Sequence, residues 1–240
     1  MATGALLFLA ALLYASVGHG GASGYLAVMA LTGTAPAEMR FSALCLNVLV
    51  SAVATFRFYR AGAFSQQLFW PLVVTSMPMA FVGGSIALPM HYFKPLVGVV
   101  LLYSAWRSFM TAQTAGNVEI RPVRWPVLVI IGAVLGLLSG LTGVGGGIFL
   151  SPLLIFFRWA QTRTVSGIAA AFILVNSLAG LAGQMTGSYS VPDELPLWLA
   201  VVFFGGFIGA TLGSRRLGNP AIQRLLALVL LVAGAKMLLT

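Results

Sequence analysis

The sequence of 240 residues contains very few charged side chains. Asp, Glu, Lys and Arg make up 7% of the chain and apolar residues make up 60%, whereas soluble domains carry about 25% charged residues. So few charges cannot cover the surface of a water-soluble fold. The uncharged stretches 1–37, 61–93 and 125–157 each exceed the roughly 20 residues that a helix needs to cross a bilayer. The sequence therefore predicts an all-α integral membrane protein with short loops.

Residues that could hold a metal or form a disulfide are nearly absent. Cys45 is the only cysteine, which excludes an internal disulfide and a zinc site built on cysteines. The two histidines, His19 and His91, are too far apart in sequence to suggest a metal cluster. The four carboxylates fall in expected loops or at helix ends, and no group of residues resembles a catalytic set. We therefore expect no enzymatic activity, no metal and no cofactor.

The net charge of +9 would suggest nucleic acid as a partner if the protein were soluble. In a membrane protein, basic residues at helix ends follow the positive-inside rule instead. The sequence has no long basic run with interleaved aromatic residues, which nucleic-acid binding would favour. The partner that the composition indicates is the lipid bilayer.

The most informative feature that is present is an internal repeat. A shift of 125 positions pairs Gly-His-Gly-Gly at 18–21 with Gly-Val-Gly-Gly at 143–146, and it also pairs Pro95 with Pro220. Each half offers four hydrophobic segments. These segments lie at about 4–32, 38–59, 68–90 and 95–112, and at about 126–157, 163–185, 194–214 and 219–240. The expected division is a first transmembrane repeat at 1–115, a linker at 116–125 and a second repeat at 126–240.

Glycines interrupt the first segment of each half. Each resulting piece spans at most ~20 Å as a helix, which is too short for a ~30 Å hydrocarbon core. Each segment is either one broken crossing or a re-entrant hairpin that enters and leaves by the same side. With two hairpins, all of the 13 Lys and Arg residues except Arg40, Lys94 and Lys236 fall on one face; with two crossings there is no bias. We therefore expect two hairpins, each followed by three transmembrane helices, as inverted repeats with both termini outside.

The two breaks are candidates for an anion-binding site. Irregular backbone at membrane depth is tolerated only against protein or a water-filled cavity, so the breaks are expected to meet near the midplane. A helix that starts there presents free N–H groups and partial positive charge, which suit a small anion. One cradle consists of Gly20, Gly21, Ala22 and Ser23, and the other of Gly145, Gly146 and Gly147. We assign the glycines that recur every four residues, at 132, 136 and 140 and at 205, 209 and 213, to helix packing.

Several polar residues could complete the site. Asn47 and Ser51 lie one helical turn apart, and the repeat aligns Ser51 with Asn176; these side chains either line the cavity or only hydrogen-bond between helices. His19 lies in the first break and either binds an anion when charged or is a structural histidine. Arg57, near the inner end of its helix, either attracts an anion or extends to the lipid headgroups.

With these features, the sequence resembles the TauE/SafE family, also called the toluene sulfonate uptake permease superfamily. The resemblance rests on Gly-Leu-Thr-Gly-Val-Gly-Gly-Gly at 140–147, the following Ser151-Pro152, the weaker motif at 18–21 and the asparagine-bearing helix at 166–187. It covers essentially the whole chain. It implies transport of sulfite, sulfonates or related small sulfur-containing oxyanions, often outward.

The expectation is thus a secondary transporter and exporter in the bacterial inner membrane. Sulfite is the leading candidate substrate, and an organosulfonate is the alternative. The anion binds at the paired breaks during alternating access, and the coupling proton or counter-ion and the oligomeric state are left open. Two other functions compete with this one. The first is an anion channel that uses the breaks as a filter, and the second is a membrane subunit that transports nothing by itself.

Overall fold

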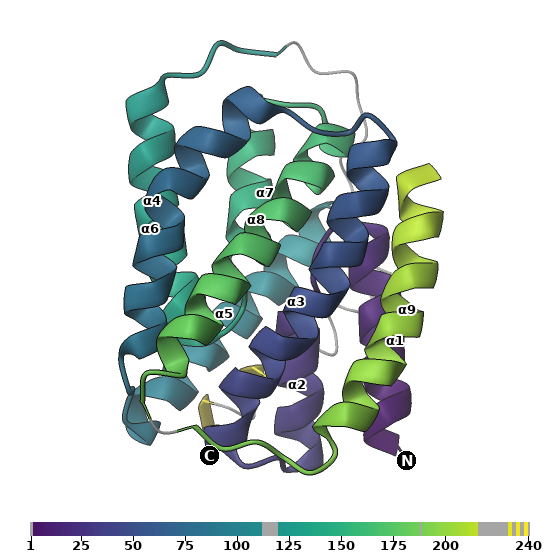
Figure 1. The fold of residues 1–240 in the computed structure, drawn as a ribbon, viewed down its shortest axis with the longest axis vertical. Helices are drawn as coiled ribbons and strands as arrows, with labels where there is room; N and C mark the ends of the chain where they lie inside the picture. The colour runs from purple at the N-terminus through teal and green to yellow at the C-terminus, as the bar shows by residue number, and fades with distance from the viewer. Residues whose placement is uncertain are drawn as a thin grey trace.

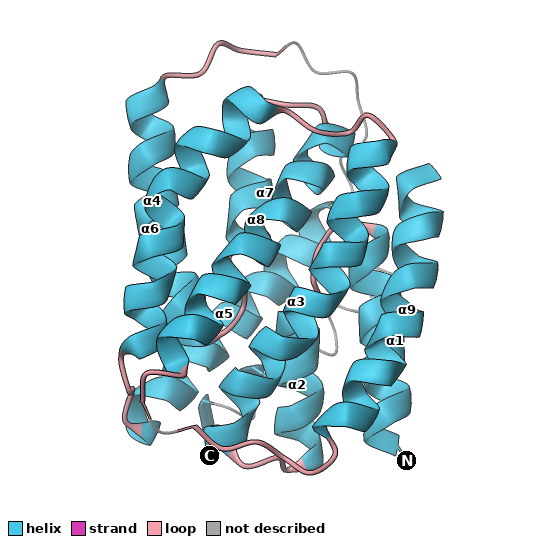
Figure 2. Cartoon of the chain, viewed as in Figure 1, coloured by secondary structure: helices cyan, strands magenta, loops and turns pink. Residues whose placement is uncertain are grey.

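The computed structural model describes residues 2–111, 120–187 and 189–215, and residues 230, 231, 234, 235, 238 and 239. Within these ranges the chain is helical and contains no strand (Figure 2). The helices are α1 (Ala2–Ser16), α2 (Ala22–Thr32), α3 (Pro36–Arg60), α4 (Gln66–Ser85), α5 (Met90–Thr111), α6 (Trp125–Thr142), α7 (Gly147–Phe156), α8 (Thr162–Gln184) and α9 (Leu195–Arg215). The expected all-α integral membrane protein is confirmed. Residues 116–119 of the expected linker and most of the expected segment 219–240 lie outside the described residues.

Five helices in the described part are long and apolar enough to cross a membrane: α3, α4, α6, α8 and α9. Four of them belong to the six spanning helices expected from the sequence. Helix α5 is not among the five, and the sixth expected span lies largely outside the described residues. Helix α6 has the length of a span but was expected to be one arm of a hairpin. It packs mainly against α4, and the chain returns after it to the end where α6 began.

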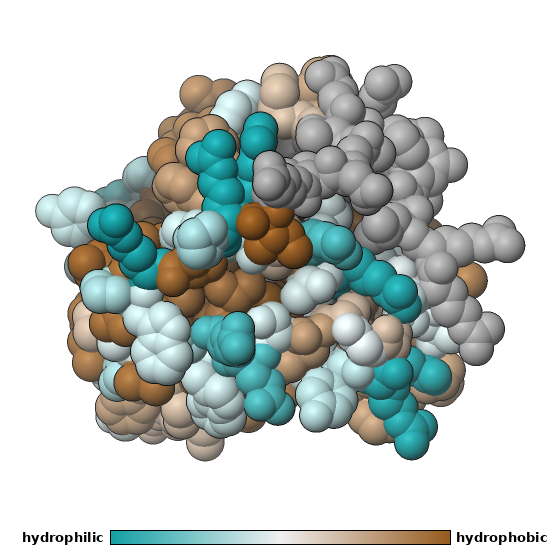
Figure 3. Space-filling model, turned by 90° about the horizontal axis from the view of Figure 1, so that it is seen from above, coloured by the Kyte–Doolittle hydropathy of each residue, from teal (hydrophilic) through white to brown (hydrophobic). Residues whose placement is uncertain are grey.

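The bundle has two ends with different charges, shown at the bottom and the top of Figure 1. At one end, which we call the acidic end, the Ser190 hydroxyl donates to the carboxylate of Glu38 (3.3 Å), and Glu194 precedes α9. At the other, the basic end, α3 finishes and α6 and α8 begin. The arginines with described side chains at this end are Arg57, Arg60, Arg121, Arg124, Arg158 and Arg163. Figure 3 looks down on the basic end and shows hydrophilic side chains gathered over it.

Each glycine break turns the chain back toward the end from which it came. After the first break, α2 runs back along α1, so that a Cβ on Gly24 would lie 2.8 Å from the Tyr14 ring and 3.1 Å from the Ala10 methyl. After the second break, α7 returns to the basic end. There the N–H of Arg121, just before α6, donates to the carbonyl of Arg158, just after α7 (2.9 Å). The α1–α2 hairpin therefore enters from the acidic end and the α6–α7 hairpin from the basic end (Figure 1).

Glycine is needed at these turns because the backbone is left-handed there. Gly18 and Gly143 have φ of +76° and +77°, and the N-cap residues Gly21 and Gly146 have φ of +99° and +76°. Residues with a Cβ pay about 1–2 kcal/mol in this conformation. Each pair is related by the 125-residue shift, so the repeat seen in the sequence is also a repeat of backbone conformation.

The glycines that recur every four residues bring pairs of helices into backbone contact. Along α9, Cβ atoms on Gly205, Gly209 and Gly213 would collide with the carbonyls of Phe8, Leu12 and Ser16 on α1, and along α6 those on Gly132, Gly136 and Gly140 would collide with the carbonyls of Leu72, Ser76 and Ala80 on α4. The assignment of these glycines to packing is confirmed. Close approach of small residues is how helices associate in lipid, where dispersion contacts and hydrogen bonds replace the hydrophobic effect.

Helices α3 and α8 pack against each other at the centre of the bundle, with α9 against α3 and α4 against α8. Most of α8 is buried, including Ala169, Ala170 and Ile173. Asn47 lies near the middle of α3 (Pro36–Arg60), and Ile173 lies at the middle of α8 (Thr162–Gln184). The two central helices thus carry Asn47 and Ile173 to the depth at which the breaks end.

Candidate functional site

The two glycine breaks meet at the side chain of Asn47. A Cβ on Gly20 in the first break would lie 2.5 Å from Asn47 Oδ1, and a Cβ on Gly145 in the second break would lie 2.7 Å from Asn47 Nδ2. The amide therefore fills the space between two turns that are 125 residues apart in the sequence. Asn47 is fully buried, so one polar side chain connects the breaks inside the protein.

Helix α8 closes the other side of this junction with an apolar and a polar residue. The Cγ2 of Ile173 would lie 2.8 Å from a Cβ on either Gly20 or Gly145. One turn further along α8, the Ser177 hydroxyl accepts a hydrogen bond from Asn47 Nδ2 (3.4 Å), which also donates to the carbonyl of Val144 (3.3 Å). The junction is therefore formed by both breaks and by both central helices.

Two helix N-termini begin at this junction. Helix α2 starts after Gly21 and α7 starts after Gly146, and both N-caps are glycines, which have no side chain to cap the first N–H groups. Ala22, Ser23 and Gly147 follow them and are buried. Two uncapped N-termini about half-way along the central helices provide backbone donors and partial positive charge without any ionised side chain.

Some buried polar atoms on the two central helices have unused hydrogen-bonding capacity, including one at the junction. Among the described residues, Oδ1 of Asn47 and Oδ1 of Asn176 are buried and accept no hydrogen bond. A buried amide oxygen without a partner costs roughly 1–3 kcal/mol. Such atoms mark places where a water molecule or a ligand belongs.

The remaining residues of the first break hold its shape. Tyr25 donates its phenolic O–H to the carbonyl of Gly20 (2.8 Å), and Ser23 donates to the Tyr14 hydroxyl (3.1 Å). His19 is half-buried, and its Nδ1 lies 3.2 Å from the carbonyl of Val17. The Ser23 hydroxyl, expected from the sequence as a possible ligand, is thus occupied by a neighbouring side chain in this conformation.

The other polar candidates, Ser51, Asn176 and Arg57, contact groups outside the two breaks. Ser51 donates to the carbonyl of Asn47, and Asn176 donates to the carbonyl of Phe172 (2.8 Å), each within its own helix. Arg57 lies apart from the breaks, with its guanidinium carbon 4.4 Å from the centre of the Phe207 ring on α9. Arg57 therefore contacts an aromatic side chain of a neighbouring helix and is not brought to the breaks.

One buried charge near the second break was missed from the sequence. Arg40 is only 6% exposed, and a Cβ on Gly143 would lie 3.2 Å from its Cγ. Sequence reasoning placed it among the helix-end arginines. One feature of the sequence could have singled out Arg40: most of the Lys and Arg residues are expected on the opposite face of the membrane.

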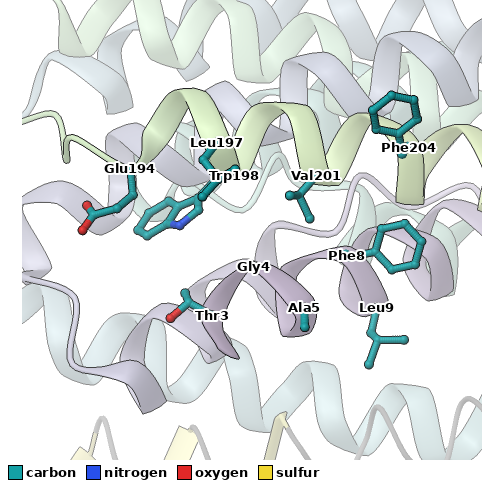
Figure 4. Close-up of a pocket in the computed structure, with 10 residues that line it drawn as sticks. All are labelled: Thr3, Gly4, Ala5, Phe8, Leu9, Glu194, Leu197, Trp198, Val201 and Phe204. Carbon is teal, nitrogen blue, oxygen red and sulfur yellow. The ribbon is translucent and has the colours of Figure 1, made fainter. Parts of the chain in front are cut away.

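A separate groove runs along the outside of the bundle between the start of α1 and the start of α9 (Figure 4). It measures about 800 Å³ and is lined mainly by apolar residues such as Phe8, Leu197 and Phe204, with Glu194 at one end. Leu197 and Phe204 are each 61% exposed. A lipid-facing groove whose charged residue is a carboxylate does not suit an anion.

Comparison with known proteins places the chain in a family. The sequence model described as "Sulfite exporter TauE/SafE" matches residues 3–237. The chain belongs to the TauE/SafE family. A probable membrane transporter protein, y4hK of Sinorhizobium fredii, is 38% identical over 234 residues, which cover 96% of this chain and 95% of that protein. The probable membrane transporter protein YjnA of Bacillus subtilis is 28% identical over 134 residues, half of each chain.

No solved structure matches the chain significantly. The family and the relatives therefore establish a multi-pass membrane transporter of the TauE/SafE family. They agree with the resemblance derived from the glycine motifs.

Proposed function

We propose that this protein is a secondary transporter that exports a small sulfur-containing oxyanion across the bacterial inner membrane, with sulfite as the leading substrate and an organosulfonate as the alternative. The observation that carries the proposal is the junction of two uncapped helix N-termini at Asn47, half-way along the central helices. The family description names sulfite export, and the junction supplies donors suited to an anion.

The anion binds between the two breaks when the two halves move apart, because in this structure the Asn47 side chain fills the space between them. Free N–H groups at the starts of α2 and α7, around Gly21–Ser23 and Gly145–Gly147, donate to its oxygens, and the Asn47 amide reorients to add Nδ2 as a donor. Backbone donors suit an oxyanion because glycine lets the chain approach closely and the fixed dipoles need no ionised residue. His19 lies at the edge of this site, and Asn176 lies in the facing helix α8.

The two halves, 1–115 and 126–240, work as an inverted repeat. This is supported by the opposite entry of the two hairpins and by the matched left-handed glycines at the breaks. Rocking of one half against the other would expose the junction to each side in turn, as in other transporters built from inverted repeats. The basic end faces the cytoplasm under the positive-inside rule, which places the N-terminus outside.

The burial of the junction favours a carrier over a channel. Gly20, Gly21 and Gly145 to Gly147 are all buried in this structure, so the site is enclosed, as an occluded state of a carrier requires. A channel that used the breaks as a filter would need a continuous path through them.

The proposal is tested by counterflow of radiolabelled sulfite in proteoliposomes, with sulfate, thiosulfate, taurine and chloride as competitors. Saturable exchange that sulfite competes for most strongly would support it, and dependence on a pH gradient would identify a coupling proton. Large unitary currents without counterflow would indicate a channel instead. Purified protein that neither binds nor moves any of these anions would refute the proposed function.

A further inference from the structure

Arg40 is a buried cation that is only partly neutralised. Its Nη1 donates to the carbonyl of Ile86 (2.9 Å), and its Nη2 donates to the carbonyls of Gly83 (2.6 Å) and Gly84 (2.7 Å). These carbonyls form the C-terminal end of α4, which carries about half a negative charge. Among the described residues, a full positive charge thus faces about half a negative one in a buried environment, where charges are normally paired.

The guanidinium also has a donor to spare. Nε of Arg40 is buried, and in the described part of the chain it donates to no group. A buried guanidinium N–H without an acceptor is costly and marks a place where an acceptor belongs. An oxyanion could accept this hydrogen bond without disturbing the three bonds to α4.

Arg40 lies on the same face of α3 as the junction. Positions 40 and 47 are seven residues apart, which is two helical turns, so their side chains share one face of the helix. The separation along the axis is about 10 Å at 1.5 Å per residue. Gly143 of the second break packs against the stem of Arg40. Arg40 is therefore placed between the junction and the acidic end of the bundle.

We propose that Arg40 is a second anion-binding position on the transport path, between the glycine breaks and the acidic end. An anion that leaves the junction toward this end accepts a hydrogen bond from Nε of Arg40. Its negative charge neutralises the part of the Arg40 charge that the carbonyls of α4 leave unpaired. The atom is enclosed in this structure, so the anion reaches it when the bundle opens at this end. The inference rests on the proposed function as an oxyanion transporter.

The second half of the chain offers a matched control. Arg163, near the start of α8, also donates to carbonyls at helix ends, those of Ala61 (3.2 Å) and Ser214 (3.3 Å), but it is exposed at the basic end. The repeat aligns Arg40 with Val165, so the buried position has no basic counterpart. If both arginines only capped helix ends, replacing either one would have the same effect on the KM for transport.

The test measures the KM for sulfite counterflow in proteoliposomes, together with the thermal stability of the purified protein. KM does not depend on the fraction of protein that is active. For Arg40→Gln we expect KM to rise by about tenfold to a hundredfold, the effect of losing a hydrogen bond to a charged group. For Arg163→Gln we expect KM to change by less than about twofold, because an exposed charge is screened by solvent.

A lower melting temperature of Arg40→Gln with an unchanged KM would show that Arg40 only caps α4, and would overturn the inference. If Arg40→Gln fails to fold, Arg40→Lys decides, because it keeps the charge but lacks Nε and the planar fork. We expect the KM of Arg40→Lys to rise by at least about threefold, since an ammonium held by the carbonyls of α4 has no N–H in the place of Nε; a wild-type KM would refute the proposal. Wild-type protein that moves no oxyanion would refute the proposed function itself.

Discussion

Gly145→Ala tests whether the two breaks are held in contact by Asn47. The new Cβ would lie 2.7 Å from Asn47 Nδ2, 2.8 Å from Ile173 Cγ2 and 3.1 Å from the Ser177 hydroxyl, at a residue with φ of +78°. All three neighbours are central to the junction, so the substitution perturbs both the backbone and the packing. Gly62→Ala is the matched control, with φ of +71° and no heavy atom of the described residues within 4 Å.

The expected magnitudes follow from separating the two effects. Left-handed backbone with a Cβ costs about 1–2 kcal/mol in either variant. Overpacking adds about 1–3 kcal/mol, and only Gly145→Ala incurs it because only that Cβ meets neighbours. We therefore expect Gly62→Ala to be destabilised by about 1–2 kcal/mol and Gly145→Ala by about 2–5 kcal/mol.

Sulfite counterflow and thermal unfolding in detergent are the two measurements. A binding site must hold its groups within about 0.5 Å of the working geometry, so displacement of the Asn47 amide is expected to reduce transport by Gly145→Ala at least about tenfold. Gly62→Ala is expected to retain most of its activity. If the two variants were equally stable and equally active, Asn47 would not be the contact that joins the breaks, and the reasoning from the junction would be wrong.

Three further predictions concern Asn47, Gly136 and Arg57. Asn47→Asp places a negative charge between the breaks and is expected to abolish sulfite binding in a calorimetric titration; an unchanged affinity would place the anion elsewhere. Gly136→Ala drives a Cβ into the backbone of α4 and should lower the melting temperature by several degrees, whereas Gly187→Ala, whose nearest atom is at 3.9 Å, should not. Arg57→Gln should leave the affinity for sulfite within about twofold, because its guanidinium packs on Phe207 and is partly exposed to solvent; a tenfold loss would contradict this placement.

The fold could be predicted to a large extent because its signals are local. The scarcity of charge indicated membrane helices, and each expected segment from 4–32 to 194–214 corresponds to a helix or a broken pair of helices. The breaks were located because consecutive glycines disfavour a helix by about 1 kcal/mol each. The same spacing argument identified the packing glycines, since positions four residues apart lie on one face of a helix.

The candidate site could be predicted only in part. The glycines and Asn47 were named from residue type and position, and the structure brings Gly20, Gly145 and Asn47 together. Ile173 and Ser177 gave no signal, because an isoleucine or a serine in an apolar helix is ordinary. Arg57 was named because it is charged, yet its partner is Phe207, which nothing local to Arg57 indicates.

By itself, the sequence determined that this is a helical membrane protein and where its glycine breaks lie, because these properties depend on the order of residues within a few helical turns. Only the tertiary structure decided that Asn47 lies between the breaks and that Arg40 is buried against the end of α4. Such contacts join residues far apart in the chain. They depend on how each helix is rotated and where it crosses its neighbours, and a rotation that leaves every local pattern intact would separate them.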